Sequence, residues 1–153
     1  MSNDETHSDI RRAVRSLCAD FPGPYWRGLD RERAYPAEFV KALSDAGFLA
    51  ALIPEDYGGS GLPLSAACAI LEEVHRSGGN GAACHAQMYT MGALLRHGSE
   101  DQKAAILPKI ASGALRLQAF GVTEPGAGVD ATRIQTFAHK DGERYIVNGS
   151  KIW

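Results

Sequence analysis

The sequence predicts a mainly α-helical protein that ends in a short antiparallel β segment. Apolar residues recur at helical spacing up to about residue 112, and after Gly113 the pattern changes to alternation. The dipeptides D-G and N-G separate the alternating stretches, as in β-hairpins. We therefore expect an all-α domain over residues 1–114 and a partial, truncated β-domain over 115–153. Because the alternation stops in mid-pattern at Trp153, we expect an N-terminal fragment or a chain whose remaining partner is missing.

Three helices are predicted in the first half of the chain. The first covers residues 7–20 and ends at FPGPYW, because two prolines and a glycine fall within residues 21–26. The second begins near Pro36 and ends before Gly47, which stands where a helix-ending glycine is expected. The third follows the Gly/Pro-rich loop after Ile53. The expected buried positions of the three helices are, in order, Ile10, Val14 and Leu17; Phe39, Val40, Leu43 and Ala46; and Leu64, Cys68, Leu71, Val74 and His75.

Two further helices precede the change of pattern. Residues 81–97 are apolar almost all round, which predicts a helix that is buried on most sides. Ser99 and Gln102 match a capping box and predict a helix over about 100–112, disturbed at Pro108. Beyond it, strands are predicted for LRLQAFGV, ATRIQTFAH and RYIVN, with a turn at KDGE, a second turn at NG and a further strand beginning at SKIW.

Composition excludes several classes of function. The net charge of −2, with signs mixed throughout, argues against a nucleic-acid or anionic-membrane surface. No apolar run is long enough to span a bilayer, and the polar N-terminus does not resemble a secretory signal. The three cysteines, Cys18, Cys68 and Cys84, form no metal or redox motif, so we expect buried reduced thiols and a cytoplasmic protein.

The charged and histidine-containing helices suggest no further site. Arg11, Arg12 and Arg15 are interpreted as a solvated helix face, and Glu72 and Glu73 as an ordinary helix surface. The histidines at 75, 85 and 97 are spaced too widely to share one helical face as metal ligands.

The stretch FGVTEPGAGVD, residues 120–130, allows two interpretations. Its glycines, closely spaced amides and Thr123 hydroxyl could hold a ligand, since successive amides can form an anion-binding nest. It matches neither the P-loop nor the dinucleotide-binding glycine motif, and it precedes a strand where the latter precedes a helix. From these residues alone, a structural turn is the better interpretation.

Two longer stretches change that estimate, because together they resemble the acyl-CoA dehydrogenase family of flavoproteins. FLAALIPEDYGGSGLP is similar to a segment of that family's N-terminal helical domain. The family's central signature is a T-E-P-x-A-G-S-D loop followed by a hairpin and N-G-x-K-x-W. It is similar to the second stretch, LRHGSEDQKAAILPKIASGALRLQAFGVTEPGAGVDATRIQTFAHKDGERYIVNGSKIW. The resemblance implies a helical domain followed by the start of a β-barrel or sandwich domain.

The resemblance also implies a cofactor and a set of site residues. FAD would lie along the loop from Phe120 to Val129. The cofactor-binding residues would be Phe120, Val122, Thr123, Gly128, Val129 and Trp153, and the substrate-binding residues would be His85, Met88 and Val129. The implied reaction is the oxidation of an acyl-CoA to a trans-2-enoyl-CoA in fatty acid metabolism. An electron-transfer flavoprotein or a similar acceptor and a homo-oligomeric full-length enzyme are the implied partners.

The chain departs from the family pattern in two ways. Val129 stands where many members have serine, so one polar contact to the cofactor or to CoA is lost. The family's catalytic glutamate belongs to a C-terminal domain, so no base is assigned here, and Glu124 is interpreted as part of the loop scaffold. The fragment alone is therefore expected to be inactive. Two alternatives stay open: a related flavoprotein oxidase or monooxygenase with a non-CoA substrate, and a flavin-free helical module whose 81–97 helix packs against a partner.

Overall fold

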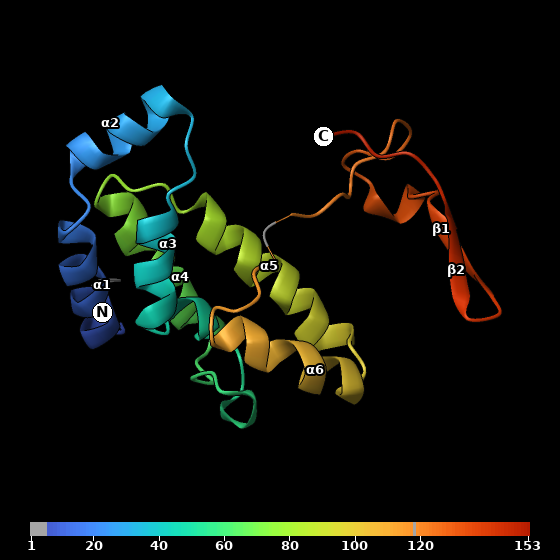
Figure 1. Ribbon diagram of the computed structural model, residues 1–153, viewed down its shortest axis with the longest axis horizontal. Helices are drawn as coiled ribbons and strands as arrows, with labels where there is room; N and C mark the ends of the chain where they lie inside the picture. Colours follow the sequence, from blue (N-terminus) through green and yellow to red (C-terminus); the bar gives the residue numbers. More distant parts are fainter. Residues whose placement is uncertain (1–5, 118) are drawn as a thin grey trace. The chain divides into compact units, whose positions relative to one another are not determined.

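The computed structural model describes residues 6–117 and 119–153 and divides the chain into two compact units, residues 1–118 and 119–153 (Figure 1). The helical unit contains α1 (Ser8–Ala19), α2 (Gly23–Glu32), α3 (Ala37–Asp45), α4 (Leu64–Arg76), α5 (Ala82–His97) and α6 (Glu100–Ala111), with 3-10 turns η1 (Phe48–Ala50) and η2 (Glu55–Tyr57). The second unit contains a 3-10 turn η3 (Ala131–Arg133) and a hairpin of β1 (Phe137–Asp141) and β2 (Arg144–Asn148). The predicted fold class is thus confirmed. Within the described residues no helix is both long and apolar enough to cross a membrane.

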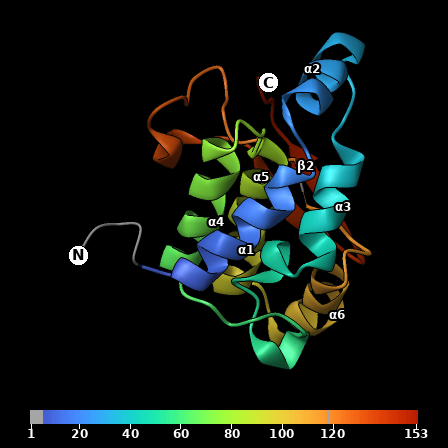
Figure 2. The same cartoon turned by 90° about the vertical axis from the view of Figure 1, so that its left-hand side faces the viewer.

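The main core of the helical unit lies among α1, α3 and α4, which run side by side (Figure 2). Val14, Phe39, Val40 and Leu43 are fully buried there, as their helical spacing predicts. Gly47 follows α3 with φ 77°, a left-handed conformation that favours glycine. The boundaries of α1 and α3 are therefore confirmed, and so is the predicted burial of these four residues. Ile10 and Leu17 are partly buried against the same core. Ala46, the C-cap of α3, is exposed, so its predicted burial is wrong.

Helix α2 was not predicted from the sequence. FPGPYW does end α1, but Pro22 is the N-cap of a new helix and Pro24 occupies its first turn. Proline is tolerated there because the first amides of a helix have no intrahelical acceptor. An edge-to-face contact of Trp26 with Phe39, at a centroid distance of 4.8 Å, holds α2 against α3.

The predicted buried face of α4 is only partly correct: Val74 is buried and Leu71 is partly buried, but the other three predicted positions are exposed. Leu64 is 69% exposed, and Cys68 and His75 are also exposed. The buried positions are Ala66, Ala67, Ala69, Ile70, Glu73 and Val74. Small alanine side chains permit the close packing of α1 on α4, so steric fit outweighs the greater hydrophobicity of leucine and cysteine.

The exposure of Cys68 leads to a testable difference among the three thiols. Cys18 and Cys84 are buried, and burial raises the pKa of both thiols, that of Cys84 to about 12. Since the thiolate is the reactive form, Ellman's reagent should modify one cysteine rapidly and the other two only upon unfolding. The Cys68→Ser variant should lose the rapid phase. Three equal rates in the native chain would contradict the packing described here.

Helix α5 is less enclosed than its composition predicts. Cys84, Gln87, Met88 and Met91 are buried, whereas other positions along the helix, including Tyr89, are exposed. Its buried face helps to form a second core with Ile53, Leu107 and Ile110.

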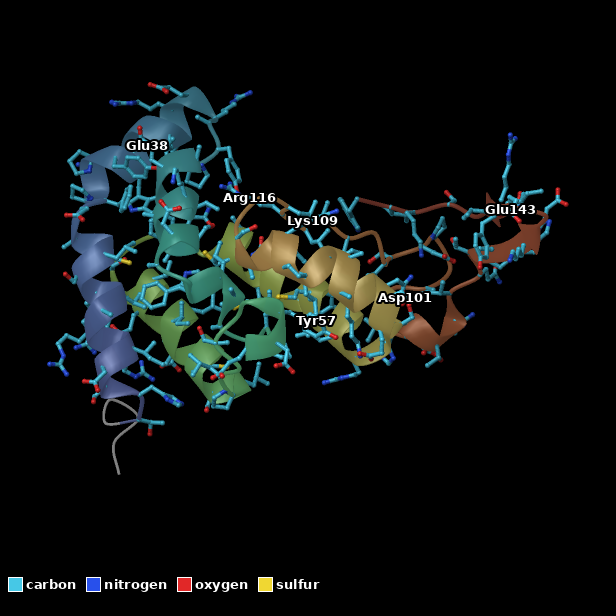
Figure 3. All side chains as sticks on the ribbon, turned by 60° about the horizontal axis from the view of Figure 1, so that its bottom comes forward. Glu38, Tyr57, Asp101, Lys109, Arg116 and Glu143 are labelled. Atoms are coloured by element: carbon cyan, nitrogen blue, oxygen red, sulfur yellow. The ribbon has the colours of Figure 1, made fainter. Side chains whose placement is uncertain are left out.

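Helix α6 begins as predicted. Its capping box is complete: the Gln102 amide donates to Ser99 Oγ, and the Ser99 amide donates to Gln102 Oε1. Pro108 lies inside the helix, and Gly113 follows it with φ 75°. Just beyond, the Arg116 guanidinium, labelled in Figure 3, donates to the Tyr35 hydroxyl at 3.3 Å.

A buried ion-pair cluster joins α1 to α4, so the prediction of solvated helix faces is wrong for Arg11 and Glu73. The Glu73 side chain is 0% exposed and accepts from Arg11 Nη1 at 2.9 Å and from Arg15 Nε at 2.6 Å. Arg76 Nη1 lies 3.6 Å from Glu73 Oε1. Arg11 is itself buried and also pairs with the half-exposed Glu72. The hydrogen bonds from Arg15 and Arg11 lower the pKa of Glu73 to about 2 despite its burial.

In the second unit only the predicted hairpin forms. β1 and β2 pair antiparallel, with Phe137 opposite Asn148 and Asp141 opposite Arg144, so the D-G turn is confirmed. Glu143, labelled in Figure 3, lies in that turn. The expected strands at LRLQAFGV and SKIW are wrong for their described residues, and the stretch before β1 holds η3. Residue 118 and the first five residues of the N-terminal segment lie outside the described part of the chain.

Candidate flavin-binding loop

Within the second unit, the structure brings the TEPGAG loop, residues 123–128, and the preceding Val122 close to the end of the chain, residues 151–153. The Ile152 amide donates to the Thr123 carbonyl at 2.9 Å. The Lys151 ammonium donates to the Val122 carbonyl at 3.1 Å and to Glu124 Oε1 at 2.9 Å. Three hydrogen bonds therefore join segments that are 27 to 29 residues apart in the sequence. Two of these bonds occupy the carbonyls of Val122 and Thr123. These residues therefore bond to the chain end and do not form the strand that the alternation predicted.

The buried carboxylate of Glu124 connects this loop to the residues before β1 and to Lys151. Its side chain is 6% exposed and accepts from the Gln135 amide at 2.7 Å and from the Thr136 amide at 2.9 Å. The pKa of Glu124 is lowered to about 2 by the neighbouring Thr136 side chain, the Gln135 amide and Lys151. Among the described residues, the Thr136 hydroxyl makes no hydrogen bond of good geometry, so it acts on the carboxylate only by its proximity. A carboxylate bound in this way is a poor proton acceptor near neutral pH. This geometry fits a scaffold residue, as the sequence suggests.

Gly149 allows the hairpin to close against the loop scaffold. A Cβ atom at this position would lie 2.0 Å from Thr136 Oγ1 and 2.6 Å from Thr136 Cβ. No side chain fits there, so the N-G turn of the sequence serves a close approach and not a further hairpin.

The free polar groups of the loop suit the edge of a flavin ring. Within the described residues, the amides of Val122 and Thr123 and the Thr123 hydroxyl donate no hydrogen bond, although both residues are only partly exposed. Cβ atoms built at Gly126 and Gly128 would meet no atom within 4 Å, so the main chain is open to a ligand on that side. Two amides, a hydroxyl and an open glycine backbone form a donor set that fits the carbonyl and nitrogen acceptors of isoalloxazine.

The remaining predicted cofactor residues lie at the surface of the same unit. Phe120 is 54% exposed, and Val129 and Trp153 are fully exposed. Trp153 follows directly on the Lys151–Ile152 pair that holds the loop, so the unit places this indole one residue from the bond to Thr123. Aromatic rings exposed beside unpaired donors are typical of a surface that receives a planar ligand.

The predicted substrate residues His85 and Met88 belong to α5 in the helical unit and line different grooves. His85 is exposed and lies in a groove with Cys68, Leu71 and His75. Met88, 7% exposed, borders another groove with Leu52, Leu64, Tyr89 and Leu95. Among the described residues, no cluster of three or more His, Cys, Asp or Glu side chains is arranged to hold a metal ion.

Lys151 belongs to the N-G-x-K-x-W motif, but the sequence alone assigns it no role. Its contacts lie in segments remote in sequence, and no periodicity reports them. The only local signal is a lysine two residues before a tryptophan, after an N-G turn. The same limit applies to Glu73, whose partners Arg15 and Arg11 lie 58 and 62 residues away.

Comparison with known proteins identifies the relatives of this chain. Residues 4–114 match the family described as acyl-CoA dehydrogenase, N-terminal domain. A probable acyl-CoA dehydrogenase of Mycobacterium tuberculosis is 38% identical over 97% of this chain and 38% of its own length. The crystal structure of acyl-CoA dehydrogenase from Geobacillus kaustophilus superimposes with a TM-score of 0.82 and 32% identity, over 96% of this chain and 39% of that one.

A further structure, described as the electron transferring flavoprotein of Acidaminococcus fermentans, contains a chain that matches with a TM-score of 0.83 and 31% identity. The match covers 99% of this chain and 40% of that one. The chain therefore spans about two fifths of the length of the proteins it resembles. A family match over most of the chain, with similar folds across both units, shows that this chain belongs to the acyl-CoA dehydrogenase family.

Proposed function

We propose that this chain supplies the flavin-binding loop of an FAD-dependent acyl-CoA dehydrogenase that converts an acyl-CoA thioester to a trans-2-enoyl-CoA. The observation that carries the proposal is the pairing of the TEPGAG loop with the K-I-W end of the chain through Lys151 and Ile152. These are the two motifs that the family resemblance assigns to FAD. Their close association in one unit supports a common ligand.

The residues of the loop would act by position and hydrogen bonding. The Val122 and Thr123 amides and the Thr123 hydroxyl would donate hydrogen bonds to the ring, and Trp153 and Phe120 would contact it. The exposed backbone at Gly128 and Val129 would follow the rest of the cofactor. When bound, FAD supplies the acceptor for the substrate's β-hydrogen as hydride, while a carboxylate removes the α-proton.

On the substrate side, His85 and Met88 from α5 and Val129 from the loop would contact the acyl-CoA. No residue of this chain is assigned as the base, because Glu124 is engaged by two amides and Lys151. We therefore expect the 153-residue chain alone to leave acyl-CoA unoxidised. The complete enzyme is proposed to be a homo-oligomer that passes electrons to an electron-transfer flavoprotein or a similar acceptor.

Val129 favours a second candidate, a related flavoprotein oxidase or monooxygenase with a non-CoA substrate. Its side chain is fully exposed and offers no hydroxyl to CoA or to the pyrophosphate. The two candidates differ in the complete enzyme: acyl-CoA bleaches the flavin of a dehydrogenase under anaerobic conditions and leaves that of the alternative oxidised.

Flavin binding is tested directly by titrating the 153-residue chain with FAD and following flavin fluorescence. We expect saturable binding that weakens about tenfold in Thr123→Val, because one hydrogen bond to the ligand is lost. Thr90→Val, which removes a hydroxyl bonded to the Ala86 carbonyl in α5, is the matched control and should bind FAD normally. Absence of saturable binding by the unaltered chain would count against a flavin loop that is complete within residues 119–153.

A further inference from the structure

We infer that Lys151 is a positioning residue that couples the end of the chain bearing Trp153 to the Val122–Thr123 loop. The inference rests on the proposed function, since it concerns how the proposed flavin loop is held. It assigns a role to a side chain that need not touch the cofactor.

The contacts of Lys151 give it this position. One ammonium group bonds both the Val122 carbonyl, at 3.1 Å, and Glu124 Oε1, at 2.9 Å, so it contacts the loop on either side of Thr123. The lysine stem passes over Gly121, whose added Cβ would lie 3.6 Å from Lys151 Cγ. The lysine side chain is only 30% exposed and therefore lies along the loop instead of extending into solvent.

Glu124 extends the connection to the hairpin. Its carboxylate accepts the Gln135 and Thr136 amides just before β1, so the loop, the start of the hairpin and the chain end meet at one carboxylate–ammonium pair. The Ile152 amide bond to the Thr123 carbonyl is the other tie between the same segments. Without the Lys151 ammonium, the distance between Thr123 and Trp153 depends on the hydrogen bond from the Ile152 amide to the Thr123 carbonyl.

In this arrangement, the groups that hold the loop differ from the groups that would bind a ligand. Among the residues that the structure describes, the amide and the hydroxyl of Thr123 donate no hydrogen bond and remain available to a ligand, while the Thr123 carbonyl accepts from the Ile152 amide. A ligand that needs both the loop donors and the indole of Trp153 is bound well only when the two are held at a fixed separation.

The test compares Lys151→Met with Lys140→Met in the 153-residue chain. Lys140 is an exposed residue of β1, so its replacement makes the same chemical change in the same unit away from the loop. The first readout needs no cofactor: exchange of the Ile152 amide proton with solvent, measured by NMR. We expect about three- to tenfold faster exchange in Lys151→Met and no change in Lys140→Met. Unchanged exchange in Lys151→Met would overturn the inference.

The second readout is FAD affinity, which we expect to fall about tenfold in Lys151→Met and to recover largely in Lys151→Arg, because a guanidinium can donate to both oxygens. Faster Ile152 exchange with FAD affinity equal to that of the unaltered chain would overturn the positioning role. If the unaltered chain binds no FAD, that result counts against a flavin loop that is complete within residues 119–153, and the exchange measurement still decides whether Lys151 holds the loop.

Discussion

Replacing Glu73 by glutamine is expected to lower the free energy of unfolding of the helical unit by about 3 kcal/mol, the low end for breaking a buried ion pair. The substitution removes a carboxylate that is 0% exposed. Within the described part of the chain, it leaves the buried Arg11 with the half-exposed Glu72 as its remaining ionic partner. Urea denaturation followed by far-UV circular dichroism measures the change. Glu72→Gln is the matched control, because its carboxylate pairs with the same arginine from the surface and should cost about 1 kcal/mol or less. Equal effects of the two substitutions would contradict the buried cluster.

The same substitution should alter the acid stability of the helical unit. The pKa of Glu73 is lowered from 4.5 to about 2 in the folded chain, so its contribution is complete above pH 4.5 and is lost as the pH falls toward 2. In Glu73→Gln this part of the pH dependence should be absent, and the stability curves of variant and parent should converge at low pH. A constant gap between the curves from pH 6 to 2 would show that the ionised carboxylate is not the cause.

Gly149→Ala is expected to disrupt the proposed flavin loop more than any other single methyl addition in the second unit. The new Cβ would meet Thr136 Oγ1 at 2.0 Å and Thr136 Cβ at 2.6 Å, and these atoms belong to a short branched side chain that cannot swing away. Overpacking of this kind costs about 1–3 kcal/mol. Because the Thr136 amide donates to Glu124, its displacement should loosen the loop, lower FAD affinity about tenfold or more, and shift the Thr136 and Gln135 amide signals in NMR spectra.

Gly126→Ala provides the control for this prediction. A Cβ at Gly126 would meet no atom within 4 Å, so the same chemical change in the same unit should leave the amide signals of residues 135 and 136 in place. Indistinguishable behaviour of the two alanine variants would show that the turn before Lys151 does not approach Thr136 as closely as described.

The elements predicted well from the sequence are those whose determinants are local. The capping box of α6, the glycine after α3 and the D-G turn of the hairpin each depend on residues within a few positions of one another. Helix α2 was missed for the opposite reason: its prolines were interpreted as breakers, although a proline at the cap or in the first turn starts a helix as readily as it ends one.

The errors concern residues whose environment is decided by distant segments. The buried face of α4 follows from the close packing of α1, and the buried state of Glu73 follows from arginines of that helix. In the second unit, the carbonyls of 122 and 123 bond Lys151 and Ile152 instead of a strand, which alternation alone could not indicate. The loop residues themselves were named from the sequence, because their motif resembles a known family, whereas the lysine that holds them was not.

The most direct test of the account uses the fluorescence of Trp153 as FAD is added. The chain has two tryptophans, and Trp26 belongs to the helical unit, so a Trp26→Phe variant leaves Trp153 as the only indole emitter. If the TEPGAG loop and the chain end form one flavin site, FAD should quench Trp153 emission with the same concentration dependence as flavin binding. Saturable FAD binding that leaves Trp153 emission unchanged would place the cofactor elsewhere and contradict the account.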